Sequence, residues 1–267
     1  MLGRFALKRI PAALCLLALP VQLAWAQSTQ DIAQQMAPCG TLRAVINLGN
    51  PILARKDASS GEPIGVSVDL ARALAETLKL PLQLMPVNSA AKSVQAVTQG
   101  QADIGFFAID PVRGEGISFT RPYILIEGSY LVRKDSPLTD NAQVDQRAHR
   151  VVVGQGSAYD LFLTRELKSA ALVRAPTSPQ VVPFFMEGTY DVAAGVKQQL
   201  ESDVQKFANL RLLPGRFMVI EQAMGQPSGT TPDAKDFLIQ FIARMKSSGF
   251  VRQSLLRHKI EGAVIAP

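Results

Sequence analysis

The feature that most constrains the fold is an alternation of short apolar segments and amphipathic segments, which occurs twice along the 267 residues. In the first half, Leu70, Leu74 and Leu78 recur at helical spacing after an apolar segment at 40–47. Strands that alternate with helices are typical of a mostly parallel sheet with right-handed crossovers. The strands predicted in this half are 40–47, 82–85 and 103–108, and the predicted helices are 68–78 and 89–100.

The same alternation restarts after a polar, turn-rich segment at 136–147. A longer apolar run at 123–132 precedes that turn-rich segment. After it, the predicted strands are 150–154, 172–175, 191–194, 210–213 and 217–224, and the predicted helices are 159–167, 179–186, 198–207, 233–247 and 250–257. Two α/β units of this kind would face each other across a cleft, which is where open parallel sheets bind ligands. The sequence therefore predicts an α/β protein of two lobes, with a switch between them near residue 128.

The first 26 residues have the pattern of an export signal. Three basic residues, Arg4, Lys8 and Arg9, precede an apolar segment at 10–24 that contains two prolines. That segment is shorter than the about 20 apolar residues that a membrane anchor needs, which disfavours the alternatives of an anchor or a buried helix. Ala24-Trp25-Ala26 is the small-x-small pattern of a cleavage site. We therefore expect cleavage after Ala26 and a mature protein in the periplasm.

Charge and cysteine content limit the function classes of the mature chain. The formal net charge of the full chain is +6, and the predicted signal carries three of these charges, so too little remains to argue for a nucleic-acid partner. Cys39 is the single cysteine after residue 26, which excludes an intramolecular disulfide, and we expect a buried thiol. His149 and His258 have no metal-ligand spacing and are predicted to lie on the surface. The sequence thus predicts no metal and no cofactor.

Five segments carry a resemblance to a known family. They are Gly40-Thr41-Leu42-Arg43, the helix start Gly65 to Ala71, the block Arg113 with Ile117 to Tyr123, and the second-half motifs Gly154 to Ser157 and Glu187 to Val192. In their order and spacing, from about residue 40 to 257, they resemble the bacterial periplasmic solute-binding proteins of the polar amino-acid class, family 3.

The resemblance implies a type II periplasmic-binding fold. Lobe 1 would comprise residues 27–128 and 221–267, and lobe 2 residues 129–220, with crossings near Pro122–Ser129 and Ile220–Ala223. Such a monomer would capture a small carboxylate-bearing solute by hinge closure and deliver it to an inner-membrane ABC permease. It would not be an enzyme.

Arg113 is the leading candidate for the binding site. By its place in the block it matches the arginine that holds the ligand carboxylate, and a guanidinium suits two carboxylate oxygens. Gly156 and Ser157 lead from a strand into a helix, where backbone N–H groups favour an anion. Capping of that helix by Ser157 is the alternative interpretation. Ala158 occupies a position where a second hydroxyl donor is frequent in the family, so one donor is missing.

Val196 departs from the family pattern. It stands five residues after Asp191, where the amino-acid binders have an aspartate that holds the ligand ammonium. An unpaired buried ammonium is costly, so this position casts doubt on a standard α-amino acid and adds an organic or aromatic acid as an alternative ligand. The neighbouring Lys197 either binds a second acidic group or, as we favour, is a solvated helix residue.

Further candidates line the predicted cleft from lobe 1. Strand alternation places Phe106 and Ala108 on one side and Phe107 on the other, so that one phenylalanine lines the cleft and the other is core. Asn47 and Asn50 are either rim residues or turn formers. Gln222, at the return crossing, either reaches the cleft or serves the hinge.

Two other functions remain open from the sequence. Some proteins that resemble this family are secreted dehydratases of the cyclohexadienyl dehydratase type, which need an acid or base in the cleft, for which Glu187, Asp160 and Glu221 are the candidates. The chain could instead present its ligand to a membrane sensor. Asp69 and Asp191 are predicted to be structural, and Asp110 to cap the short helix that carries Arg113.

Overall fold

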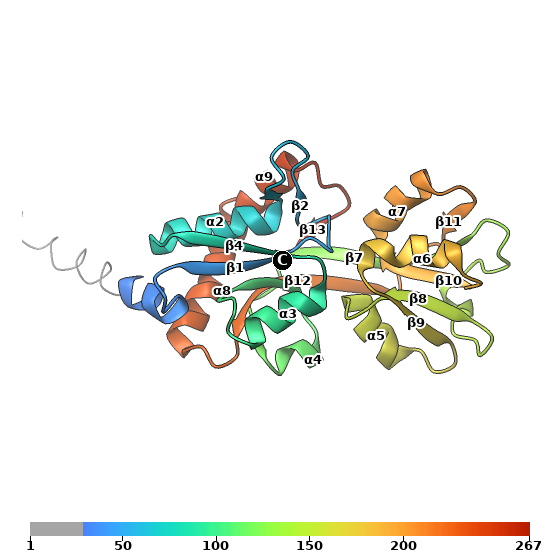
Figure 1. The fold of residues 1–267 in the computed structure, drawn as a ribbon, viewed down its shortest axis with the longest axis horizontal. Helices are drawn as coiled ribbons and strands as arrows, with labels where there is room; N and C mark the ends of the chain where they lie inside the picture. The colour runs from blue at the N-terminus through green and yellow to red at the C-terminus, as the bar shows by residue number, and fades with distance from the viewer. Residues whose placement is uncertain (1–28) are drawn as a thin grey trace, which may run out of the picture.

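The protein has two lobes joined by two long strands, as Figure 1 shows for the computed structural model, which describes residues 29–267. The predicted signal peptide and its cleavage site lie outside the described residues. The two-lobed α/β architecture predicted from the sequence is confirmed.

Lobe 1 begins with a helical stretch at 29–36 and is built around the parallel pair β1 and β4, with β5 alongside β1. Its strands are β1 (Leu42–Asn47), β2 (Arg55–Lys56), β3 (Pro63–Ile64), β4 (Leu82–Val87), β5 (Gly105–Ala108), β6 (Ile117–Phe119) and β13 (Val264–Ile265). Its helices are α2 (Val66–Leu78), α3 (Ala90–Thr98), α4 (Pro111–Gly114), α8 (Pro232–Ser247) and α9 (Phe250–Arg257). The hydrophobic pattern did not predict the helical stretch at 29–36 or the short strands β2, β3, β6 and β13.

Lobe 2 is a sheet in which β8 lies parallel to both β9 and β10. Its strands are β8 (Arg150–Gly154), β9 (Ala171–Ala175), β10 (Val192–Val196) and β11 (Leu210–Leu212). Its helices are α5 (Ala158–Glu166), α6 (Val181–Glu187) and α7 (Lys197–Lys206), with short 3-10 turns η1 (Asn141–Gln143) and η2 (Ser178–Gln180). The predicted strand–helix order of this half is confirmed to within a few residues at each end.

Two antiparallel strands of ten residues each, β7 (Ile124–Arg133) and β12 (Met218–Pro227), connect the lobes (Figure 1). They pair with each other from Met218↔Gly128 to Gln222↔Ile124. Beyond this stretch, β7 continues into lobe 2 beside β10 and β11, whereas β12 continues into lobe 1 beside β5 and β6. The predicted lobe boundaries fall within these two strands and remain a prediction.

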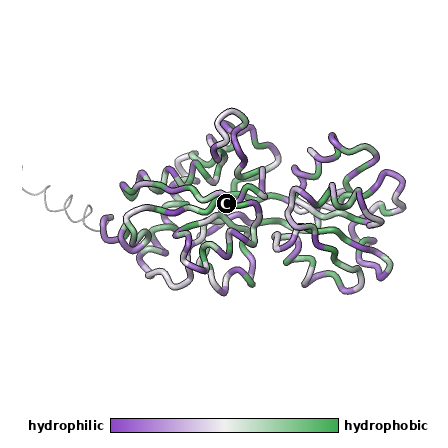
Figure 2. The backbone as a smooth tube through the Cα atoms, viewed as in Figure 1, coloured by the Kyte–Doolittle hydropathy of each residue, from purple (hydrophilic) through white to green (hydrophobic). Residues whose placement is uncertain are grey.

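Each lobe has its own hydrophobic core, which Figure 2 shows as apolar strands enclosed by more polar outer segments. In α2 the helical repeat Leu70, Leu74 and Leu78 is buried against β1, as its spacing predicts. Gly65 precedes this helix with φ 132°, and a Cβ there would clash with the carbonyl oxygen of Leu53. Only glycine therefore lets α2 begin directly against the 47–54 loop.

Two predictions about single residues are wrong. Cys39 is exposed, because it lies in the turn between the helical stretch at 29–36 and β1, while Ala33, Met36 and Ala37 supply the buried contacts. The side chain of His258 is largely buried, since its Nε2 lies 2.9 Å from Oδ2 of Asp69. Asp69, predicted to be structural, thereby ties α2 to the end of α9.

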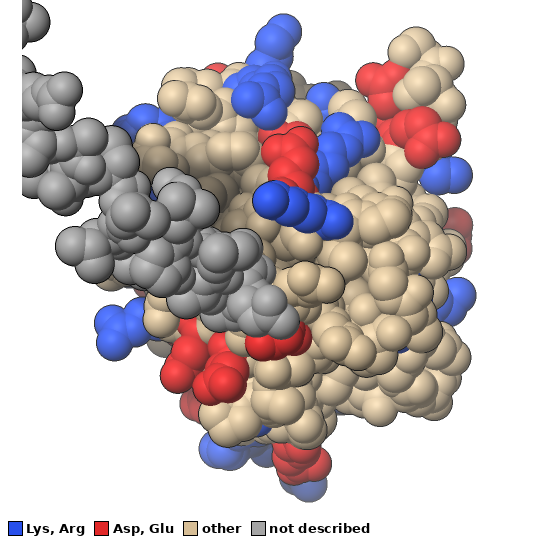
Figure 3. Space-filling model, turned by 90° about the vertical axis from the view of Figure 1, so that its left-hand side faces the viewer, with Lys and Arg blue, Asp and Glu red and all other residues tan. Residues whose placement is uncertain are grey.

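Three observations on the described residues concern surface charge, helix length and possible metal ligands. On the face in Figure 3, positive and negative side chains are interspersed rather than separated by sign. Among residues 29–267, no helix is long and apolar enough to cross a membrane. That same part of the chain contains no cluster of three or more potential metal ligands.

Candidate functional site

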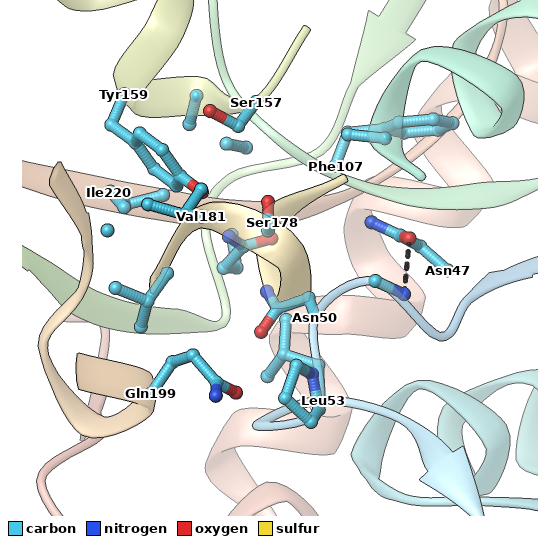
Figure 4. A pocket seen from close by; sticks show the side chains of 18 of the residues that line it. Asn47, Asn50, Leu53, Phe107, Ser157, Tyr159, Ser178, Val181, Gln199 and Ile220 are labelled. Atoms are coloured by element: carbon cyan, nitrogen blue, oxygen red, sulfur yellow. Dashed lines mark hydrogen bonds between the residues drawn. The ribbon is translucent and has the colours of Figure 1, made fainter. Parts of the chain in front are cut away.

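A cavity lies between the lobes, bordered by side chains from both (Figure 4). Lobe 1 contributes the 47–53 loop, the start of α2, the end of β5 and Arg113. Lobe 2 contributes the starts of α5 and α6 and one face of α7. The lining residues that carry the discussion below are Asn47, Asn50, Phe106, Phe107, Ala108, Arg113, Ser157, Ala158, Tyr159, Val196, Gln199, Asp203 and Gln222.

Arg113 is a buried cation in the lining of this cavity, with only 4% of its surface exposed. The short helix α4 holds it, and the backbone N–H of Val112 donates to Oδ1 of Asp110 to cap that helix as predicted (3.0 Å). Arg113 donates from Nη1 to the carbonyl oxygen of Ala108 (3.0 Å) and from Nη2 to that of Gly156 (2.9 Å). Its Nε is buried and has no hydrogen-bond partner among the described residues.

The electrostatic state of Arg113 follows from its burial. Loss of hydration lowers the pKa of Arg113 to about 10, and the nearby Asp110 carboxylate opposes that shift. The side chain therefore remains a cation at neutral pH. No carboxylate of the described chain forms a salt bridge with it, because Asp110 pairs with Arg165 instead. A buried guanidinium with free N–H groups is a strong site for a carboxylate.

The start of α5 faces the same cavity. Oγ of Ser157 accepts from the backbone N–H of Asp160 (3.1 Å), so the capping interpretation is correct, and Ser157 also lines the cavity. Gly156 has φ +67° and turns the chain into the helix. Asp160 does not line the cavity, since it accepts from the Gly156 N–H (2.8 Å) and pairs with Arg174 (3.0 Å).

Several contacts cross the cleft and hold the lobes together. Arg113 on lobe 1 donates to Gly156 on lobe 2. Arg165 Nη2 on α5 lies 2.8 Å from Oδ2 of Asp110 on lobe 1. A Cβ at Gly156 would lie 3.0 Å from Cβ of Ala91 on α3. The structure therefore shows the lobes in a closed arrangement.

The position of Val196 is as expected, but its surroundings add polar groups that the sequence pattern did not indicate. Val196 precedes α7 and lines the cavity, whereas Lys197 lies outside the lining and pairs with Glu127 on β7 (3.2 Å). Gln199 and Asp203 follow three and seven residues after Val196 and line the same cavity. In the sequence, the spacing of three and then four residues from Val196 along a predicted helix indicates that these side chains share one helix face.

Most of the predicted site residues border the cavity. Nine of the ten do so, and the exception is Gly156, which contacts Arg113 through its carbonyl oxygen instead. The alternation in β5 is confirmed, because Phe106 and Ala108 pack in one hydrophobic cluster and Phe107 in another. Both phenylalanines border the cavity, which corrects the expectation that only one would do so. The reason is that the cavity lies at the carboxyl end of the strand, where residues of both faces reach it.

The motifs in the sequence did not indicate the residues that α5, η2, α6 and α7 add from lobe 2. These are Tyr159, Ser178, Val181, Val182, Gln199, Leu200 and Asp203. None belongs to a motif that could be matched, and which face of each helix turns toward the cleft depends on how the lobes pack. Asn47 is both a turn former and a lining residue, because its Oδ1 accepts from the Gly49 N–H (2.9 Å).

The family described as bacterial extracellular solute-binding proteins, family 3, matches residues 44–258. The chain belongs to this family. The match spans both lobes and includes the whole of β7, β12 and the cavity lining. Among curated protein sequences, none matches this chain.

Solved structures with the same fold cover most of both chains. A putative ABC transporter binding component from Wolinella succinogenes, complexed with lysine, is 24% identical with a TM-score of 0.70, over 82% of this chain and 95% of that one. A solute receptor for L-cysteine from Neisseria gonorrhoeae is 22% identical with a TM-score of 0.74, over 86% and 94%. An ancestral amino acid-binding protein, a precursor of cyclohexadienyl dehydratase, is 19% identical with a TM-score of 0.71, over 84% and 98%. At these identities the likeness shows the fold.

Proposed function

We propose that this family member is the periplasmic substrate-binding component of an ABC importer, which captures a small carboxylate-bearing solute in the interlobe cavity. The observation that carries the proposal is the buried Arg113 guanidinium, which has no carboxylate partner among the described residues and an unpartnered Nε. A ligand carboxylate would supply the missing counter-charge and accept from the free N–H groups. Ser157 and the first N–H groups of α5 border the same cavity and favour an anion there.

Hinge closure is supported by the connection between the lobes. Only β7 and β12 among the strands run through both lobes of the described structure, so rotation about their shared stretch would open the cavity. The contacts from Arg113 to Gly156 and from Arg165 to Asp110 would separate as it opens. Ligand binding and closure would therefore favour each other. The closed form would be the one that a permease recognises.

The class of solute is an amino acid or an organic acid. Val196 removes the carboxylate expected beside an ammonium, which is the reason to include organic acids. The Wolinella and Neisseria structures are described with lysine and L-cysteine, and these relatives support an amino acid. No comparison supports an organic acid.

The geometry supports binding rather than catalysis. None of the three acids considered for a dehydratase, Asp160, Glu187 and Glu221, lines the cavity. Asp203 does line it, so a hydrolytic or eliminating reaction would have to use that carboxylate. We expect a bound solute to leave the protein chemically unchanged, because the three acids considered for a dehydratase lie outside the lining and Asp203 is engaged by Nε2 of Gln199 and Nζ of Lys206.

The test compares wild-type protein with the variant Arg113→Ala. Thermal-shift measurements against amino acids and organic acids, with mass spectrometry of any co-purifying compound, should identify a carboxylate ligand for the wild type. Its affinity should fall by about 100-fold or more in Arg113→Ala, because hydrogen bonds to a charged partner contribute about 1.5–3 kcal/mol each and the guanidinium offers more than one. Arg147→Ala, at an exposed position without an ion pair in the described structure, is the matched control. Equal affinity in the two variants would exclude Arg113 from the site and overturn the proposal.

A further inference from the structure

The two ends of the cavity differ in their hydrogen-bonding character. At one end lie the donors, namely the Arg113 guanidinium, the Ser157 hydroxyl and the start of α5. At the other end, Asn50 from lobe 1 and Gln199 from lobe 2 approach each other from opposite walls, well away from Ser157 (Figure 4). The groups at this second end present acceptors.

Gln199 owes its orientation to Asp203, one turn further along α7. Nε2 of Gln199 donates to Oδ2 of Asp203 (2.9 Å). A reversed amide would place its oxygen against the carboxylate, where two acceptors repel each other. This hydrogen bond turns the nitrogen side of the amide toward Asp203, so the amide oxygen of Gln199 lies on the other side and is available as an acceptor in the cavity.

Asp203 is unusual for a charged helix residue, because it is 5% exposed. Its other oxygen, Oδ1, lies 3.3 Å from Nζ of the exposed Lys206. A carboxylate can accept about four hydrogen bonds, so these two contacts leave part of its capacity unused. The residue therefore places negative charge beside the cavity as well as fixing Gln199.

Asn50 supplies an acceptor from the facing lobe. Its Oδ1 is buried and has no hydrogen-bond partner in the described part of the chain. A buried acceptor without a partner is costly, and a donor on the ligand would relieve that cost. Two amide oxygens, one from each lobe, and a buried carboxylate thus converge on one end of the cavity.

We propose that Asn50, Gln199 and Asp203 form the subsite for a primary amine of the ligand, and so replace the carboxylate that Val196 lacks. Gln199 and Asn50 accept the N–H groups directly, and Asp203 acts as a positioning residue that orients Gln199 and balances the ammonium charge. This inference rests on the proposed function, in which Arg113 holds the carboxylate of the same molecule. It selects amine-bearing carboxylates over organic acids of the same size.

The test uses probes that share a carboxylate and carbon chain but differ in the amine. Pentanoate, 2-aminopentanoate and 5-aminopentanoate are titrated calorimetrically into wild-type protein and into variants. At least one amine-bearing probe should bind about 10-fold or more tightly than pentanoate, because an ammonium donates charge-assisted hydrogen bonds. Equal or tighter binding of pentanoate would overturn the subsite.

Variants on α7 distinguish a role in amine binding from a role in the stability of the helix. Gln199→Leu should remove the preference for the amine, while Gln205→Leu, at an exposed position of the same helix, should retain it. Asp203→Asn should also reduce the preference, because its amide can donate to the Gln199 oxygen and turn the Gln199 N–H groups toward the ligand. An unchanged preference in Gln199→Leu would contradict the inference even if Asp203→Asn fails to fold.

Arg113→Ala separates this inference from the proposed function. Loss of binding for all three probes in that variant, without an amine preference in the wild type, would refute the subsite and leave the proposed function standing. Absence of any Arg113-dependent binding across the probes and the wider acid panel would overturn both.

Discussion

Replacing Arg165 by glutamine removes an ion pair that crosses the cleft and should shift the protein toward an open form. Nη2 of Arg165 on α5 lies 2.8 Å from Oδ2 of Asp110 on lobe 1. The side chain of Asp110 is 4% exposed and that of Arg165 is 40% exposed, so solvent screens the pair from one side only. Asp110 keeps its hydrogen bond from the Val112 N–H in the variant, which preserves the helix that carries Arg113.

The magnitude follows from this intermediate exposure. Solvent-exposed pairs contribute about 0.2–1 kcal/mol, and hydrogen bonds to charged groups about 1.5–3 kcal/mol. We take about 1 kcal/mol for the Arg165–Asp110 pair, which is about a five-fold change in the ratio of closed to open molecules. Ligand affinity should fall by up to the same factor, because the ligand binds the closed form.

Single-molecule fluorescence energy transfer can measure this ratio. Cys39 is exposed on lobe 1 and accepts one dye, and Ala208→Cys, at an exposed position of lobe 2, accepts the other. Arg165→Gln should enlarge the open population relative to Arg147→Gln, which removes an exposed arginine of the same lobe that has no ion pair in the described structure. Identical distributions for the two variants would refute the conclusion that this pair contributes to closure.

Three further predictions concern stability. Gln226→Met should raise the free energy of unfolding by about 1 kcal/mol, because Gln226 is 1% exposed and neither amide atom has a partner in the described structure. A lower free energy of unfolding in urea experiments would show that the amide is satisfied in the wild type. Asp69→Ala should lower the free energy of unfolding by about 2 kcal/mol, since Asp69 accepts hydrogen bonds from Ser254 (2.6 Å) and Arg257 (2.9 Å). Ligand affinity should not change, because Asp69 lies outside the cavity lining, and a change in affinity without a change in stability would contradict this prediction. The hydrogen bond from Arg216 lowers the pKa of Glu127 below its ordinary value of 4.5. The ionised Glu127 side chain therefore contributes its full stabilisation above about pH 4.5, and that stabilisation is lost as the pH falls through the lowered pKa of the folded state. The stability difference between wild type and Glu127→Gln should therefore be larger at pH 7 than at pH 3, and a constant difference would refute the linkage.

The sequence predicted most of the secondary structure because the elements are strongly patterned. The repeat of Leu70, Leu74 and Leu78 can be buried only by a helix, and Ser157 caps α5 as its residue type suggests. The two-residue strands β2, β3 and β13 escaped prediction because they are too short to show a period.

The residues of the candidate site were likewise predicted only in part. Arg113 and Ser157 were predicted because they belong to local motifs whose chemistry is readable from the chain. Gln199 and Asp203 were not, because a polar face on a helix looks the same in sequence whether it meets solvent or a cavity. Cys39 and His258 show the same limit, since their burial depends on neighbours distant in sequence.

The sequence by itself determined the alternation of strands and helices, the doubling into two lobes and the arginine suited to a carboxylate. Only the tertiary structure decided what surrounds that arginine. It pairs Asp110 with Arg165 across the cleft, leaves the Arg113 cation without a carboxylate in the described chain, and turns Asn50 and Gln199 toward each other. The physical reason is that hydrophobic periodicity fixes local elements, whereas the charges and acceptors of a binding site acquire their partners only when segments distant in sequence pack together.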